Sequence, residues 1–115
     1  MISMTEKKPI QGRRVIVQFT TAPVGEGVGV SRFVAEALRE VEGSGLRFQL
    51  TPMSTVLEAE SLREAVEVIL RAHEAVFRAG AERVITDIKI DDRRDEPRVM
   101  EDKVEKVKRL LSADR

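Results

Sequence analysis

Three stretches of the chain alternate between apolar and polar residues with a period of two, which predicts β-strands. The first begins after Arg14 and ends at Pro23. The second, residues 46–60, is interrupted at Pro52 and Met53, so that it predicts two strands joined as a hairpin. The third covers residues 83–91. The sequence therefore predicts four strands.

Three other stretches repeat their apolar residues with the spacing of an α-helix, within residues 30–45, 61–80 and 97–113. Ser31 is the predicted N-cap of the first helix, because its hydroxyl can accept from a helix amide. Ser61 opens an S-x-x-E capping box at the start of the second helix. The apolar stripe of that second helix comprises Leu62, Ala65, Val66, Ile69, Leu70, His73, Val76 and Phe77.

The order of the predicted elements is β-α-β-β-α-β-α. This order predicts an α+β, ferredoxin-like antiparallel sheet of four strands, covered on one face by the two long helices, with an extra C-terminal helix. We expect residues 1–12 to be a flexible N-terminal tail and residues 13–115 to form a single domain.

The alternation assigns the strand residues to two faces. The helix-covered face is expected to hold Val15, Val17, Phe19, Phe48, Leu50, Leu57, Ile88 and Ile90. The opposite face is expected to hold Gln18, Thr20, Gln49, Thr51, Glu58, Asp87 and Lys89, with Ile16, Val56 and Ile85 among them. This face is either an ordinary solvated surface or is buried against a second subunit. An open sheet with exposed edges favours homo-oligomers formed through sheet faces or edges.

Composition narrows the classes of partner. The 115 residues carry 20 basic and 20 acidic side chains. This charge balance argues against nucleic acid and anionic membranes as binding partners. Without Cys and with a single His, there is little material for a thiolate nucleophile or a transition-metal site. The chain shows no membrane span and no signal-peptide core, so we expect a cytoplasmic protein.

Several motifs allow both a structural and a functional interpretation. The glycines of "GEGVG" (residues 25–29) form either a flexible loop or the rim of a ligand site. His73 is either a core residue with a hydrogen-bonded neighbour or a ligand contact. "DDRRD" (residues 91–95) is either a salt-bridged turn or a contact across an oligomer. In "TPMST" (residues 51–55) the hydroxyls either shape the turn or bind a ligand, and Met53 can lie against a flat ring.

Three strings, "LTPMSTVLEAE", "HEAVFRAGAERVITDIKIDDRRD" and "MEDKV", closely resemble the small thiamine-binding protein family. The resemblance extends from Val15 to about Leu111. It implies a ferredoxin-like fold, dimers and tetramers assembled through the sheets, and binding of thiamine or its hydroxymethylpyrimidine part. No catalytic activity and no cofactor other than this ligand are implied.

Our candidate site residues come from the residue pattern. Hydroxyls can form hydrogen bonds with both the amino donor and the ring acceptors of the aminopyrimidine. Carboxylates can stabilise the cationic thiazolium, and Met53 can contact a ring in place of an aromatic side chain. The candidates are Thr20, Ser31, Thr51, Met53, Ser54, Thr55, Glu58, Asp87, Lys89 and Asp91.

No phosphate-binding motif is visible, so unphosphorylated thiamine is a better candidate than the diphosphate. One alternative is a regulatory sensor of another metabolite, such as an amino acid or a nucleotide. The other alternative is an enzyme that uses Asp87, Lys89 and His73, which is disfavoured because the pattern places His73 on the other side of the sheet.

Overall fold

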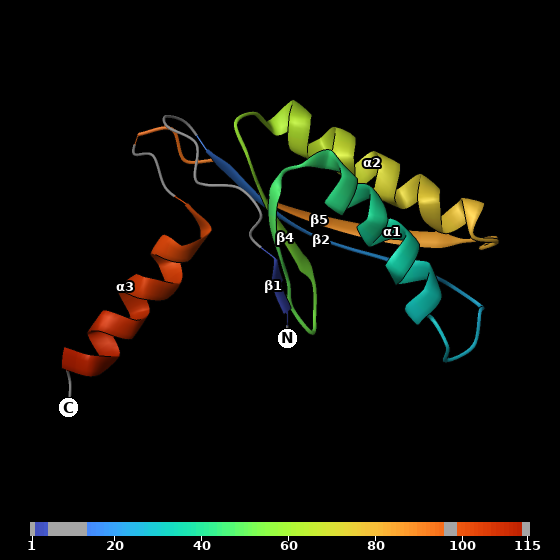
Figure 1. Ribbon diagram of the computed structural model, residues 1–115, viewed down its shortest axis with the longest axis horizontal. Coiled ribbons are helices and arrows are strands. Elements are labelled where there is room, and N and C mark those ends of the chain that lie inside the picture. Colours follow the sequence, from blue (N-terminus) through green and yellow to red (C-terminus); the bar gives the residue numbers. More distant parts are fainter. Residues whose placement is uncertain (1, 5–13, 96–98, 114–115) are drawn as a thin grey trace.

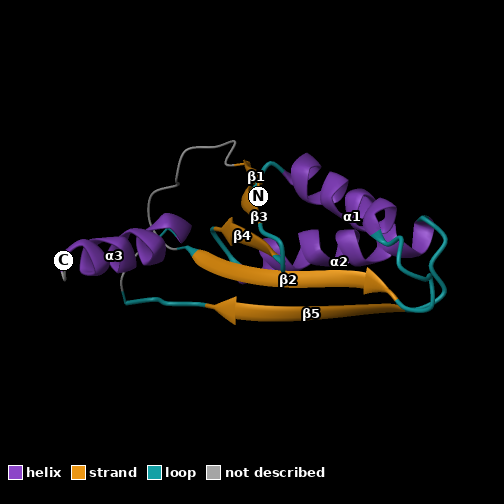
Figure 2. Cartoon of the chain, turned by 90° about the horizontal axis from the view of Figure 1, so that it is seen from below, coloured by secondary structure: helices purple, strands orange, loops and turns teal. Residues whose placement is uncertain are grey.

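The computed structural model describes residues 2–4 (backbone only), 14–95 and 99–113, and it shows one antiparallel sheet with helices (Figure 1). The elements are β1 (Ile2–Met4), β2 (Val15–Pro23), α1 (Ser31–Ser44), β3 (Arg47–Leu50), β4 (Thr55–Ala59), α2 (Leu62–Arg78), β5 (Val84–Asp91) and α3 (Met100–Ala113). The strand order is β1-β3-β4-β2-β5. Helices α1 and α2 lie on the same side of the sheet, and α3 lies beyond the N-terminal end of β2 (Figure 2). The ferredoxin-like prediction is confirmed.

The N-terminus differs from the expected flexible tail. Ile2–Met4 forms strand β1, which pairs antiparallel with the edge of β3 and extends the four-stranded sheet to five strands. The alternation of the N-terminal residues is too short to signal such a strand. Residues 5–13 lie outside the described part of the chain.

The two predicted helix caps have different outcomes. The box at Ser61 is confirmed, because the backbone amide of Glu64 donates to Ser61 Oγ at 3.2 Å. Its reciprocal bond is shifted by one residue, since Glu64 Oε1 accepts from the amide of Glu60 at 3.3 Å. The prediction for Ser31 is wrong: Ser31 is the first helical residue, and the cap position belongs to Val30, which has no side-chain bond. Pro97, which the sequence places in the first turn of the third predicted helix, lies outside the described residues.

The core lies between the sheet and helices α1 and α2. Its buried apolar residues are Val15, Val17, Phe19, Phe33, Ala37, Val41, Phe48, Leu57, Ala59, Ala65, Val68, Ile69, Ala72, Val76 and Ala81.

Four residues that we expected in the core are largely exposed. Ile88 and Ile90 are 43% and 46% exposed, because β5 is an edge strand that the two helices cover only in part. Leu70 and Phe77 of α2 are also exposed, since the helix buries Val68, Ala72 and Ala75 instead. Helix α2 packs against both α1 and the sheet, which rotates its buried face away from the predicted stripe.

No helix of the described residues combines the length and the apolar character that are needed to cross a membrane.

Candidate functional site

A cavity opens on the helix-covered side of the sheet, between α1, strand β2 and the turn that joins β3 to β4. It is lined by Phe19, Thr20, Thr21, Val34, Ala37, Leu38, Leu50, Thr51, Pro52, Met53, Ser54 and Thr55. Its volume is about 160 Å³. An engineered apolar cavity of about 150 Å³ in another protein holds benzene. The cavity is therefore large enough for one six-membered ring, and none of the described residues that line it is charged.

The turn over residues 51–54 shapes the mouth of this cavity. The Thr51 amide and the Thr51 hydroxyl both donate to the carbonyl of Ser54, at 2.9 and 3.0 Å. Thr51 Oγ1 also accepts from the amides of Met53 and Ser54, at 3.3 and 3.1 Å. The hydroxyl of Thr51 is thus occupied within the turn, so its part in the site is to hold Met53 at the rim. Met53 is 84% exposed there.

Two buried hydroxyls remain for a ligand at the cavity wall, those of Thr21 and Thr55, which are 7% and 5% exposed. Thr55 Oγ1 makes no hydrogen bond within the described part of the chain. Thr21 Oγ1 lies 2.7 Å from Thr86 Oγ1 on β5, and Thr86 Oγ1 lies 2.6 Å from His73 Nδ1 on α2. The structural interpretation of His73 is confirmed, since the half-buried imidazole bonds to a neighbouring side chain.

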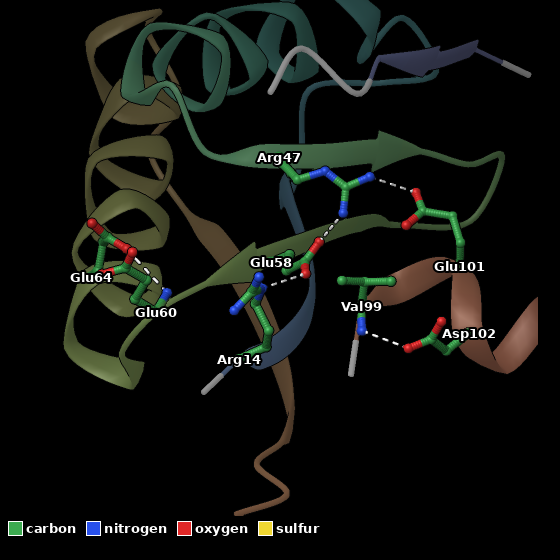
Figure 3. Close-up of polar contacts among 8 residues, drawn as sticks. All are labelled: Arg14, Arg47, Glu58, Glu60, Glu64, Val99, Glu101 and Asp102. Atoms are coloured by element: carbon green, nitrogen blue, oxygen red, sulfur yellow. Dashed lines mark hydrogen bonds and ion pairs between the residues drawn. The ribbon is translucent and has the colours of Figure 1, made fainter. Parts of the chain in front are cut away.

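The opposite face of the sheet carries a buried ion cluster (Figure 3). Glu58 is 2% exposed and accepts from Arg47, and its Oε1 lies 3.1 Å from Arg14 Nε. Arg47 also forms an ion pair with Glu101 of α3 at 2.9 Å, and the side-chain amide of Gln49 donates to the same carboxylate at 3.2 Å. Burial raises the pKa of the Glu58 carboxyl, and the nearby Arg47 and Arg14 oppose this rise. The cluster attaches the start of α3 to the sheet.

Glu58 therefore cannot act as we expected. We expected its carboxylate to stabilise a cationic ligand, but two guanidinium groups already occupy it. The sheet also lies between this carboxylate and the cavity, because Glu58 pairs across the strands with Ile16 and Arg47 on the outer face.

A larger and more open hollow, of about 390 Å³, lies on the outer face beside α3. It is lined by Ile16, Gln18, Val56, Lys89, Ile90, Asp91, Asp92 and Lys103. Asp91 forms an ion pair with Lys103, which joins the end of β5 to α3. In the following turn Arg93 pairs with Asp95 at 2.7 Å and Arg94 pairs with Asp92 at 3.0 Å. The salt-bridged interpretation of residues 91–95 is confirmed.

The structure divides the ten candidate residues between several places. Thr51, Met53, Ser54 and Thr55 line the cavity, and Thr20 borders it although the strand register places Thr20 opposite Asp87 on the outer face. Lys89 and Asp91 line the outer hollow. Glu58 is buried in the ion cluster, Asp87 is exposed on the outer face, and Ser31 is exposed at the start of α1. The predicted polar surface is thus two surfaces, separated by the thickness of the sheet.

The residues that the enzyme hypothesis requires do not converge. His73 bonds to Thr86 on the helix-covered face. Asp87 and Lys89 lie opposite Thr20 and Gln18 on the other face. Alternation along β5 places Thr86 and Asp87 on opposite sides, so that the sheet separates His73 from Asp87 and Lys89.

Sequence reasoning missed the α1 wall of the cavity and one of its hydroxyls. Val34, Ala37 and Leu38 have the apolar spacing of a packing helix in the sequence, and in the structure they also border the cavity. Thr21 was overlooked because it follows the polar Thr20 and precedes the strand end. Its place in the alternation, two residues after buried Phe19, is the signal that could have found it.

The glycine-rich loop is not part of the cavity wall. Gly25 and Gly27 have positive φ angles, of 87° and 75°, and these allow the chain to turn between β2 and α1.

Comparison with known proteins gives consistent matches. A family model described as "Thiamine-binding protein" matches residues 17–108. A UPF0045 protein of Methanothermobacter thermautotrophicus is 43% identical over 98 residues, which cover 84% of this chain and 99% of the relative. The UPF0045 protein YqgV of Bacillus subtilis is 42% identical over 101 residues, covering 84% and 96%.

Two solved structures are similar in fold. A domain of unknown function, DUF77, from Bacillus cereus has a TM-score of 0.75 and 33% identity, over 86% of this chain and 94% of that one. A Thermotoga maritima protein has a TM-score of 0.70 at 20% identity, over 82% and 98%. That protein was described as a candidate for thiamine biosynthesis or salvage.

Proposed function

The chain belongs to the thiamine-binding protein family, and from this premise we propose that its cavity binds thiamine or the hydroxymethylpyrimidine part of thiamine. The observation that carries the proposal is a neutral cavity of about 160 Å³ with hydroxyls in its wall and a methionine at its mouth. Such a cavity matches the volume of one pyrimidine ring, which offers an amino donor beside ring acceptors. Thr55 and Thr21 supply the polar contacts.

The size and neutrality of the cavity suggest how thiamine is oriented. The pyrimidine ring enters, and the cationic thiazolium stays at the mouth, because a charge costs free energy in a cavity without a counter-ion. Met53, exposed at the rim, offers a polarisable surface to the thiazolium. No basic side chain of the described residues lines the cavity, which favours unphosphorylated thiamine over the diphosphate.

The role that fits this arrangement is that of a non-catalytic carrier, buffer or sensor. The Thermotoga maritima protein with the same fold, described in connection with thiamine biosynthesis or salvage, supports a thiamine-related role. The alternative is a sensor of another metabolite with one ring, for which the same cavity would serve. A cytoplasmic location and the lack of a nucleic-acid partner stay predictions from composition.

We also propose that the chain forms dimers or tetramers through sheet faces and edges. Helix α3 exposes Val104, Val107, Leu110 and Leu111, each about half exposed, and β5 exposes Ile85, Ile88 and Ile90 along a sheet edge. An edge strand and an apolar helix stripe are surfaces that a second copy can cover.

Calorimetric titration tests the ligand. We expect saturable binding of hydroxymethylpyrimidine and thiamine, and much weaker binding of thiamine diphosphate. The variant Val34→Phe should fill the cavity and weaken binding by about tenfold or more, since a ring cannot share that volume. Val56→Phe, on the outer face, is the matched control and should bind like the wild type. Equal losses in both variants would contradict the assignment of the cavity.

Light scattering tests the assembly. We expect a mass of two or four chains for the wild type. The double variant Val107→Lys and Leu111→Lys should lower that mass, because two charges would then interrupt the apolar stripe. Val28→Lys in the glycine-rich loop, where Val28 is fully exposed, is the control and should leave the mass unchanged. A monomeric wild type would contradict the proposal.

A further inference from the structure

A line of three polar side chains joins the cavity to helix α2. Thr21 lies in the cavity wall on β2, Thr86 lies opposite it on β5, and His73 lies above Thr86 on α2. The successive distances are 2.7 Å between the two hydroxyl oxygens and 2.6 Å between Thr86 Oγ1 and His73 Nδ1. The first is an ordinary hydrogen-bond distance between two hydroxyls, and the second is slightly shorter than the usual distance between a nitrogen and an oxygen.

The protons of this line are coupled, because each threonine hydroxyl has one proton to donate. When His73 Nδ1 carries no proton, Thr86 donates to it and accepts from Thr21. The proton of Thr21 is then committed to Thr86, and Thr21 offers only lone pairs to the cavity. When Nδ1 carries the proton, the direction reverses, and the hydroxyl of Thr21 can donate into the cavity. The histidine tautomer thus selects the polarity of a group in the cavity wall.

We propose that Thr21 contacts the bound ring, and that Thr86 and His73 determine whether its hydroxyl accepts or donates a hydrogen bond. In the complex with an aminopyrimidine, Thr21 accepts from the amino group, Thr86 donates to His73 Nδ1, and the imidazole proton is on Nε2. This inference rests on the proposed function, because it assumes that the ring occupies the cavity.

The arrangement of the cavity hydroxyls supports this division of roles. Thr51 is occupied by the turn, and Thr55, which has no bond within the described residues, can rotate to donate to a ring nitrogen. Thr21 is a cavity hydroxyl that a side chain of the neighbouring strand β5 orients, at 2.7 Å. A hydroxyl that is held as an acceptor favours a ligand with an amino group opposite it. A ligand with an oxo group at that position is disfavoured, because the oxo oxygen and the hydroxyl oxygen would then be two acceptors facing each other. Thr21 and its two supports therefore act on ligand selectivity.

The test compares hydroxymethylpyrimidine with the analogue that carries an oxo group in place of the amino group. We expect the wild type to prefer the amino compound by about tenfold or more, as expected when a buried polar group loses its partner. Thr86→Val keeps the shape of the side chain and removes the link, so the preference should fall to about twofold or less. Thr86→Ser restores the hydroxyl and should restore the preference.

A second readout is spectroscopic and needs no variant. The chain contains one His, so the ¹⁵N resonances of a single imidazole report the tautomer directly. Saturation with the amino compound should fix the Nε2–H tautomer, and the oxo analogue should shift the population towards Nδ1–H.

Three outcomes would overturn the inference, and they are distinguishable. A full amino preference in Thr86→Val would show that the relay has no part in selectivity. Identical imidazole resonances in the wild type saturated with the amino compound and with the oxo analogue would show the same, even if Thr86→Val failed to fold. Failure of the wild type to bind either compound would refute the proposed function itself, and the inference with it.

Discussion

The two faces of the sheet use polar residues in opposite ways. On the outer face, charged groups are paired with one another: Glu58 lies between Arg14 and Arg47, and Glu101 extends the cluster to α3 (Figure 3). On the helix-covered face, the polar groups beside the cavity are neutral hydroxyls in an otherwise apolar wall. The cluster on the first face pairs buried charges with one another, whereas the second face leaves neutral hydroxyls at a cavity.

This difference shows why the charged face is the poorer candidate for ligand binding. A carboxylate between two guanidinium groups has little capacity left for a third partner, and separating such a buried pair costs several kcal/mol. A neutral hydroxyl at a cavity wall can bind a ligand without the separation of a charge pair. Specificity for a small ring is therefore better placed beside the helices, and the outer cluster is a structural attachment for α3.

The largest effect that would test this contrast is on stability. Glu58→Gln should lower the free energy of unfolding by about 3 to 5 kcal/mol, because it removes the buried carboxylate that is paired with both Arg14 and Arg47. Urea denaturation measures the change. Glu105→Gln, which removes an exposed partner of Lys108, is the control and should change stability by less than about 0.5 kcal/mol. A similar, small change in both variants would contradict the structural role of the cluster.

A smaller effect on the free energy of unfolding is expected when two neighbouring residues of β4 are compared. Leu57→Ala should cost about 3 kcal/mol, because Leu57 is fully buried beneath the helices. Val56→Ala should cost about 1 kcal/mol, because Val56 is only half-buried on the outer face. Thermal and urea unfolding of the two variants give the ratio. Equal costs would mean that the outer face is as tightly packed as the core, as a covering subunit would make it.

The smallest effect concerns ligand charge. Asp87→Asn should change the dissociation constant for thiamine by less than about twofold, because Asp87 is exposed on the face opposite the cavity. Titration with thiamine and with neutral hydroxymethylpyrimidine checks it. A selective loss of thiamine binding would mean that the binding site lies on the outer face, where the sequence analysis placed the candidate carboxylates.

Much of the fold could be predicted from the sequence, because local patterns determine it. Period-two alternation identified strands β2 to β5, and the Ser61 capping box marked the start of α2. The faces of β2 and β4 were also correct, since register and alternation are linked. The exposure of Ile88 and Ile90 was not predictable from β5 alone, because strand order decides which strand lies at the edge.

The site was only partly predictable for a related reason. The break at Pro52 and Met53 signalled an unusual turn, and the residues around it do line the cavity. The residues of α1 that line the cavity have the same apolar spacing as core residues in the sequence. They border a cavity because α1 and the turn over residues 51–54 do not pack against each other there. The pairing of Glu58 with Arg14 and Arg47 depends on neighbouring strands and was equally invisible in the linear pattern.

Amide chemical-shift mapping with hydroxymethylpyrimidine tests the central claim most directly. If the helix-covered cavity is the site, the largest shifts will fall on Thr21, on Val34 to Leu38 and on Met53 to Thr55. Shifts concentrated instead on Gln18, Val56, Lys89 and Asp91 would place the ligand in the outer hollow and contradict the account.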